Sequence, residues 1–131
     1  MSTMEGKKAL VTGGKRRIGR GIALALAEAG CDVGINDLER DDDAEETLEM
    51  IRALGRQTEF YAADISDTEQ VQAMFAAFGE RFGTIDALAN NPYWSEGMPF
   101  LEITEEAWDR TIDVCVKGFF LCSQAAARRM I

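Results

Sequence analysis

Short apolar runs alternate with amphipathic helical segments four times along this chain of 131 residues. Each run has the length of a strand and is followed by apolar residues at helical spacing. The four runs are Ala9-Leu10-Val11, Val33–Asn36, Phe60–Ala63 and Ile85–Ala89. Repeated alternation of this kind is typical of βαβ units around a parallel sheet. We therefore predict one α/β domain over residues 1–131, a doubly wound parallel sheet with the strand order 3-2-1-4.

The helical segments carry start signals and stripes of apolar side chains. Asp42 or Asp43 is the expected N-cap of the second helix, and a capping box of Ser66 and Glu69 is expected to open the third. Thr104 is expected to open a long fourth helix. The third helix should face inward with Val71, Phe75, Phe78 and Phe82, and the fourth with Trp108, Ile112, Cys115, Phe119, Cys122 and Ala126.

Composition excludes several classes of protein. The formal net charge of -9 argues against a nucleic-acid partner, because phosphate contacts need clustered Lys and Arg. No apolar run is long enough for a membrane span and the start lacks a secretory pattern, so we expect a cytoplasmic protein with no membrane partner. Three cysteines without C-x-x-C spacing, and no histidine at all, predict buried reduced thiols and no metal site.

Charge is distributed unevenly along the chain. Residues 1–30 hold six basic and two acidic side chains, whereas residues 31–70 hold thirteen acidic and three basic ones. A small basic segment is therefore followed along the sequence by an acidic stretch. The acidic cluster Asp41–Asp43 with Glu45 and Glu46 is interpreted as a solvated helix N-terminus rather than a metal site.

A glycine-rich turn, Thr12–Gly19, stands between the first strand and the first helix. Backbone N–H groups and the helix dipole at such a turn favour a phosphate group. Gly13 allows a tight turn, Gly19 allows the helix to pack close to the sheet, and the basic residues Arg16 and Arg17 add positive potential. The turn therefore predicts a phosphate-binding site.

Two carboxylates follow the second and third strands. Asp37 lies 24 positions after Gly13, where it can accept hydrogen bonds from the ribose of an adenosine and repel a 2′-phosphate. Asp64 is placed to accept a hydrogen bond from an adenine amino group. For each carboxylate, helix capping is the alternative role. Together with the glycine turn, this spacing indicates a dinucleotide site.

Five motifs in order now identify a resemblance: Thr12-Gly13-x-x-x-x-Ile18-Gly19, Asp37, Asp64-Ile65, Asn90-Asn91 and Val114-x-x-Lys117-Gly118. This order resembles the short-chain dehydrogenase/reductase family from Lys7 to Ile131. The resemblance implies a Rossmann-type NAD(P)-binding domain and hydride transfer between a nicotinamide and a carbonyl or alcohol. It implies a cofactor site formed by Gly13, Arg16, Arg17, Ile18, Gly19, Asp37, Asp64, Ile65, Asn90 and Asn91. NAD is expected in preference to NADP because of Asp37, although Arg16 and Arg17 act in the opposite direction.

The chain departs from the family pattern at three places. Arg17 stands where a glycine is usual, as it does in the similar pteridine reductases, and could reach the pyrophosphate. Pro92-Tyr93 replaces the Ala-Gly that usually follows the two asparagines, which puts close backbone approach to the cofactor in doubt. Cys115 replaces the asparagine of the catalytic tetrad. The family's proton relay is therefore expected to be broken.

The family's catalytic Ser and Tyr-x-x-x-Lys would follow Ile131, and neither Tyr61 nor Tyr93 has a lysine four residues on. We therefore expect a domain that is cut after its fourth βα unit and lacks catalytic residues. Such a domain should bind a dinucleotide. It should act on a carbonyl or alcohol only if the missing half is supplied. The unpaired fourth strand and the long helix predict a homo-oligomer. Alternative interpretations are a non-catalytic nucleotide-binding or interaction protein, and a fragment that assembles with a second chain.

Overall fold

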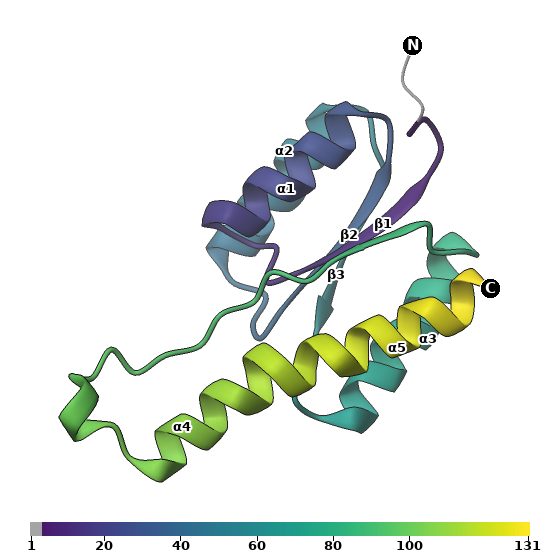
Figure 1. Ribbon diagram of the computed structural model, residues 1–131. Coiled ribbons are helices and arrows are strands. Elements are labelled where there is room, and N and C mark those ends of the chain that lie inside the picture. Colours follow the sequence, from purple (N-terminus) through teal and green to yellow (C-terminus); the bar gives the residue numbers. More distant parts are fainter. Residues whose placement is uncertain (1–3) are drawn as a thin grey trace.

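The computed structural model describes residues 4–131 and has a four-stranded parallel sheet at its centre (Figure 1). The strands are β1 (Lys8–Thr12), β2 (Asp32–Asp37), β3 (Thr58–Ala62) and β4 (Ala87–Ala89). Their order is β3-β2-β1-β4, and every neighbouring pair is parallel. The predicted doubly wound sheet and its strand order are confirmed. The fourth strand is shorter than predicted, since its pairing with β1 begins at Ala87.

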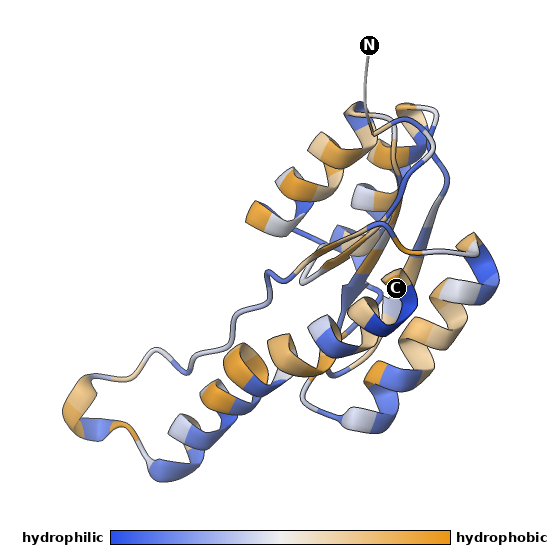
Figure 2. Ribbon diagram, turned by 45° about the vertical axis from the view of Figure 1, so that its right-hand side comes forward, coloured by the Kyte–Doolittle hydropathy of each residue, from blue (hydrophilic) through white to orange (hydrophobic). Residues whose placement is uncertain are grey.

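Helices cover both faces of the sheet. α1 (Arg17–Glu28) and α2 (Asp42–Ala53) lie on one face, and α3 (Thr68–Phe82) and α5 (Gly118–Met130) lie on the other (Figure 1). Successive side chains of a strand point to opposite faces, so Val11 joins the core beneath α1 and α2 while Leu10 joins the core beneath α3 and α5. Figure 2 shows apolar residues along the strands and recurring along the helices on both sides.

The phenylalanine stripe of α3 is buried as predicted and packs against β3. Phe78 lies between Phe82 and Tyr61, with ring centroids 4.8 and 5.9 Å away. A Cβ at Gly34 would come within 2.9 Å of Phe78, so a glycine in β2 makes room for this aromatic group.

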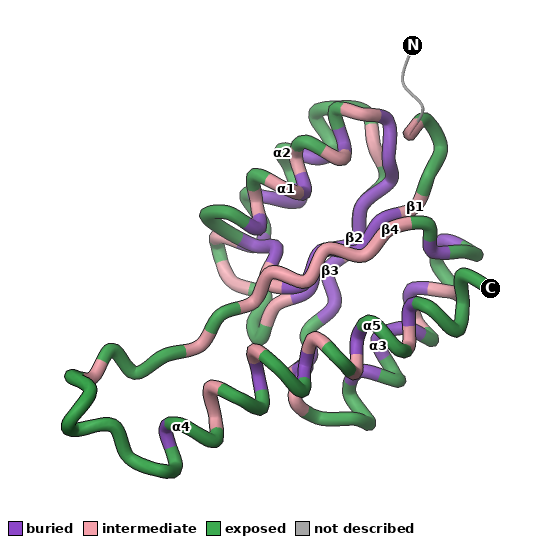
Figure 3. The backbone as a smooth tube through the Cα atoms, viewed as in Figure 1, coloured by how far each residue is buried: buried purple, intermediate pink, exposed green. Residues whose placement is uncertain are grey.

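The long fourth helix is continuous but not uniform. It consists of α4 (Glu105–Ile112), a π-helical segment (Asp113–Lys117) and α5. Trp108 and Ile112 were expected on its buried face, which is wrong, because they are 60% and 36% exposed. The α4 end projects beyond the sheet and the π-helical turn changes the register of the face (Figure 3). The residues that are buried along this stretch are Ala107, Val114, Gly118, Cys122 and Ala126.

Helix N-caps were predicted correctly once and wrongly twice. Thr104 caps α4 by accepting a hydrogen bond from Ala107 N at 3.0 Å. Asp41, not Asp42 or Asp43, caps α2, and Asp67, not Ser66, caps α3. Ser66 is engaged by Asp64, which accepts hydrogen bonds from its backbone N–H and its hydroxyl. The helix therefore begins one residue later than the capping-box pattern predicts.

The three cysteines are free thiols. Cys31 and Cys122 are buried and Cys115 is half-buried. Burial raises the pKa of Cys122 to about 12. In residues 4–131, no helix combines the length and apolar character that crossing a membrane requires.

An ionic cluster joins the amino ends of the first three strands. The Asp32 carboxylate accepts hydrogen bonds from Lys8 Nζ at 2.5 Å and from Gln57 N at 2.8 Å, and Arg56 Nε lies 3.9 Å away. Burial alone would raise the pKa of Asp32. These hydrogen bonds and the two cations outweigh that effect and hold the pKa below its usual range. The charged form of Asp32 is therefore the form that the fold stabilises.

We predict that Asp32→Asn lowers the free energy of unfolding at pH 7 by about 1–3 kcal/mol, because hydrogen bonds to a charged group are lost. A depressed folded-state pKa stabilises the fold above the unfolded-state pKa, and this contribution disappears as pH falls through the folded value. The difference in the free energy of unfolding between variant and wild type should therefore shrink below about pH 4. Urea unfolding at several pH values measures it. Asp109→Asn is the control, since Asp109 is exposed and forms no ion pair within the described residues. A difference that stays constant down to pH 3 would contradict the prediction.

Candidate functional site

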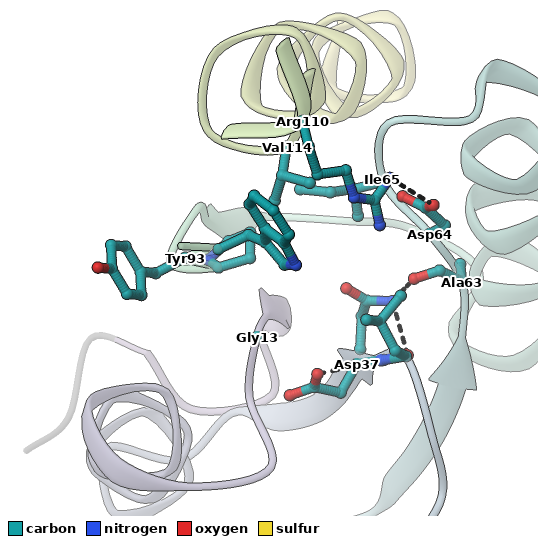
Figure 4. A pocket seen from close by; sticks show the side chains of 12 residues that line it. Gly13, Asp37, Ala63, Asp64, Ile65, Tyr93, Arg110 and Val114 are labelled. Atoms are coloured by element: carbon teal, nitrogen blue, oxygen red, sulfur yellow. Dashed lines mark hydrogen bonds and ion pairs between the residues drawn. The ribbon is translucent and has the colours of Figure 1, made fainter. Parts of the chain in front are cut away.

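The carboxyl ends of the four strands meet at one edge of the sheet. Two adjoining cavities lie there. The turn-side cavity, about 330 Å³, is lined by Gly13, Arg16, Arg17, Ile18, Asp37, Asn91, Pro92 and Tyr93. The Asp64-side cavity, about 60 Å³, shares Gly13, Asp37, Pro92 and Tyr93 and adds Asn36, Leu38, Ala63, Asp64, Ile65, Trp94, Arg110 and Val114 (Figure 4).

The glycine turn is closely packed, and its two outer glycines are required for it. Gly13 has a φ of +64°, and a Cβ there would lie 2.8 Å from Pro92 Cα. A Cβ at Gly19 would lie 1.9 Å from the carbonyl oxygen of Gly13. The reason predicted for Gly19, close packing of the helix on the sheet, is therefore incomplete: the nearest obstacle is the turn itself. Any side chain at Gly19 would displace the carbonyl of Gly13.

Arg17 has a φ of +52° and is the only non-glycine residue with a positive φ in the described part of the chain. This left-handed conformation explains why a glycine is usual at this position in the family pattern. The Arg17 side chain is exposed, lines the turn-side cavity and forms no ion pair within residues 4–131. It is therefore a free cation beside the turn.

The other basic residues of the turn contact the acidic stretch that follows β2. Lys15 Nζ lies 2.7 Å from Asp41, and Arg16 Nη1 lies 3.6 Å from Asp43. Arg20 donates to Thr47 Oγ1 at 2.8 Å and approaches Glu46. The basic and acidic segments of the sequence thus meet between α1 and α2. Arg20 thereby joins α1 to α2, and Lys15 joins the turn before α1 to the N-cap of α2.

Asp37 ends β2 and lines both cavities. Its Oδ1 accepts a hydrogen bond from Leu38 N at 3.0 Å, and the side chain is half-buried. The preceding residue, Asn36, fixes this strand end. Asn36 Nδ2 donates to Tyr61 O at 3.0 Å and to Ala63 O at 3.2 Å, and Gly14 N donates to the carbonyl oxygen of Asn36. Asn36 was missed in the sequence because its partners are 25 and 27 residues away.

Asp64 is held by two neighbours. Its Oδ1 accepts hydrogen bonds from Ser66, and its Oδ2 lies 3.2 Å from Arg110 Nη1 (Figure 4). Burial alone would raise the pKa of Asp64, but these hydrogen bonds and the charge of Arg110 keep it below its usual range. The helix-capping alternative for Asp64 is wrong, because Asp67 provides the N-cap of α3, while Asp64 closes a turn just before the helix.

Arg110 on α4 is a second site residue that sequence reasoning missed. Besides Asp64 it contacts Ser66 Oγ at 3.2 Å, and its guanidinium lies 5.9 Å from the ring centroid of Trp94. It thereby joins α4, the loop after β3 and the loop after β4 along one wall of the Asp64-side cavity. No local pattern around Arg110 indicates this role, because its partners are separated from it by 46 and 44 residues.

The two asparagines after β4 point in different directions. Asn91 Nδ2 donates to the carbonyl oxygen of Gly13 at 3.0 Å, and Asn91 N donates to Thr12 Oγ1. Asn90 Nδ2 instead donates to Ser123 Oγ on α5 at 2.9 Å, and its buried Oδ1 has no partner among the described residues. Asn91 therefore braces the glycine turn, whereas Asn90 lines neither cavity.

Besides Arg17, the chain departs from the family pattern at Pro92, Tyr93 and Cys115. Pro92 packs directly against Gly13, so the backbone after β4 lies close to the glycine turn. Tyr93 is 80% exposed and extends away from the Asp64-side cavity (Figure 4). Cys115 packs partly buried against the α3–α5 core and lines neither cavity.

This geometry fits a dinucleotide. The N-cap Arg16 makes no side-chain hydrogen bond to the first N–H groups of α1, and Arg17, without an ion pair among the described residues, lies beside them. Asp37, at the end of the next strand, lines the same cavity. Phosphate, ribose and base would then follow one another along the edge of the sheet, at the point where the strand order reverses between β1 and β4.

Comparisons with known proteins agree with the fold and with the family resemblance. The family model for short chain dehydrogenases matches residues 7–131. A 3-oxoacyl-(acyl-carrier-protein) reductase FabG from Staphylococcus aureus is 38% identical over 125 residues, which are 95% of this chain and 51% of that protein.

Solved structures show the same relation. A short chain dehydrogenase from Burkholderia cenocepacia in complex with NADP has a TM-score of 0.91 at 37% identity, over 96% of this chain and 51% of that one. An NAD⁺-bound xylitol dehydrogenase has a TM-score of 0.92 at 29% identity, over 98% of this chain and 50% of that one. This chain thus spans about half the length of its relatives. Its strand order, its glycine turn and the match over residues 7–131 show that it belongs to the short-chain dehydrogenase family.

Proposed function

We propose that residues 1–131 form an NAD(P)-binding domain of an oxidoreductase that moves a hydride between a nicotinamide and a carbonyl or alcohol. One observation carries the proposal: Gly13, in a turn that forms only because Gly19 has no Cβ, lines the same cavity at the edge of the sheet as the carboxylate of Asp37. In this proposal Arg16, Arg17, Ile18 and Asn91 lie along the phosphates and the nicotinamide half. Asp64 and Ile65 line the adjoining Asp64-side cavity, whereas Asn90, also in the predicted cofactor set, lines neither cavity.

NAD is the proposed cofactor, with NADP less favoured. Asp37 meets the ribose and repels a 2′-phosphate, whereas Arg16 and Arg17 attract one. The relatives do not decide between the two, since one solved structure is bound to NAD⁺ and another to NADP.

The proposed chemistry of the whole protein needs groups outside residues 1–131. Tyr61 Oη is buried in the core and burial raises the pKa of Tyr61 to about 12, so this phenol is a poor proton donor for a substrate. Tyr93 has no lysine four residues on. The proton donor would therefore come from elsewhere, with the substrate undefined. A cytoplasmic homo-oligomer, associating through the exposed side of α4 and α5 where Trp108 and Phe120 lie, belongs to the same proposal.

A second candidate function is nucleotide binding without catalysis. Cys115, which stands where the family's catalytic asparagine is expected, and Pro92-Tyr93 favour it. Both candidates share the cofactor site and differ only in turnover. A longer form of the protein, assayed for NADH oxidation with carbonyl substrates, would separate them.

We predict that Gly19→Ala weakens NAD binding at least about tenfold, because the new methyl group would displace the carbonyl of Gly13 and distort the turn. Gly21→Ala is the matched control, since it lies on the same helix and its Cβ would meet no atom within 4 Å. The control should bind NAD normally and gain up to about 1 kcal/mol in stability. Isothermal titration calorimetry and thermal unfolding measure both. Equal affinities of the two variants would contradict the proposed site.

We predict that the unmodified protein binds NAD more tightly than NADP. The Asp37→Asn variant should reduce the ratio of NAD affinity to NADP affinity about tenfold or more, because the carboxylate no longer repels a 2′-phosphate. Titration of both cofactors into wild type and variant measures the ratio. Tighter binding of NADP by the wild type would show that the arginines dominate.

We predict no detectable dehydrogenase activity for residues 1–131 alone, even where NAD binding is measurable. General acid–base catalysis contributes about 10²–10⁴-fold, and its proton donor lies outside this segment in the proposal. NADH oxidation followed by absorbance with a panel of carbonyl compounds measures turnover. An active family member assayed in parallel checks the conditions. Sustained, substrate-dependent oxidation by protein of verified mass would refute this prediction.

A further inference from the structure

We propose that Asp43, in the first turn of α2, is a positioning residue that biases the site against NADP by engaging Arg16. The inference rests on the proposed dinucleotide site and concerns a carboxylate that lines neither cavity. It assigns part of the cofactor preference to α2, in addition to the strand-end carboxylate Asp37.

Arg16 is the basic residue that forms an ion pair with Asp43. Its Nη1 lies 3.6 Å from Asp43 Oδ2, and the two side chains are 56% and 45% exposed. Arg16 also lines the turn-side cavity together with Asp37 and Arg17. Its guanidinium therefore stands between the ribose-facing part of the site and the acidic start of α2.

The neighbouring cations do not depend on the Asp43 carboxylate in the same way. Lys15 is 8% exposed and pairs with Asp41 at 2.7 Å. Arg20 donates to Thr47 Oγ1 and to the backbone oxygens of Lys15 and Asp43, and its distance to the Asp43 carboxylate is 4.0 Å. Loss of that carboxylate would leave the bonds of Lys15 and most of those of Arg20 in place. Arg16 would be released.

The consequence for ligand choice follows from charge. Exposed ion pairs contribute little to folding, so the Arg16–Asp43 contact acts mainly on the local potential. A 2′-phosphate needs a free guanidinium, which can bind it through charge-assisted hydrogen bonds. Asp43 competes with the phosphate for Arg16 and adds a negative charge nearby. NAD carries no 2′-phosphate, so its binding is affected much less.

The test compares Asp43→Asn with Asp42→Asn by calorimetric titration of NAD and NADP at low ionic strength. Both variants remove one negative charge from the same helical turn and leave the N-cap Asp41 intact. Asp42 is exposed and forms no ion pair with any described residue, so it controls for net charge. Asp43→Asn should shift the NADP/NAD affinity ratio toward NADP about threefold to fivefold more than Asp42→Asn does. Adding Arg16→Ala to Asp43→Asn should remove the extra shift.

The possible results separate this inference from the proposed function. Equal shifts in the two single variants, or a shift that survives Arg16→Ala, would overturn the role of Asp43 and leave the dinucleotide site standing. Failure of the unmodified protein to bind either cofactor would overturn both. A shift specific to Asp43, dependent on Arg16 and weakened by salt, supports the inference.

Discussion

The absence of a Cβ at Gly19 is the constraint on which the site depends. A methyl group there would lie 1.9 Å from the carbonyl oxygen of Gly13, and the same oxygen accepts the hydrogen bond of Asn91. The end of β1, the start of α1 and the loop after β4 are therefore fixed against one another at a single point. The phosphate-binding turn can form only because these three segments meet so closely.

Electrostatic contacts connect this turn to the rest of the edge. Lys15 in the turn and Arg20 on α1 contact the start of α2, so the position of the turn is tied to the strand that ends in Asp37. Asn36 ties the same strand to β3 through two backbone carbonyls, and Arg110 ties the loop after β3 to α4. Hydrogen bonds and ion pairs thus connect the turn, the ends of β2 and β3, and α4 along one surface at the edge of the sheet. Such a surface suits a long ligand that must be held at several points.

Local patterns in the sequence were reliable where one segment decides its own structure. The alternation of apolar runs predicted every strand, and the phenylalanine spacing of α3 predicted a buried face. Errors arose where contacts or backbone geometry outside the local pattern change the structure. Ser66 was expected to cap α3, but Asp64 engages it, and the face of the last helix changes register at a π-helical turn that its sequence does not reveal.

The sequence alone determined the strand order, the place of the glycine turn and the two carboxylates at the ends of the second and third strands, Asp37 and Asp64, because each depends on residue type and spacing along the chain. The tertiary structure decided which charges are free. Arg16 and Arg17 look alike in the sequence, but Arg16 contacts Asp43 while Arg17, in a left-handed conformation, has no ion pair among the described residues. The tertiary structure also brought Arg110 and Asn36 into the site. Contacts between residues 25 to 46 positions apart arise only when the sheet and helices are packed, and no local pattern encodes them.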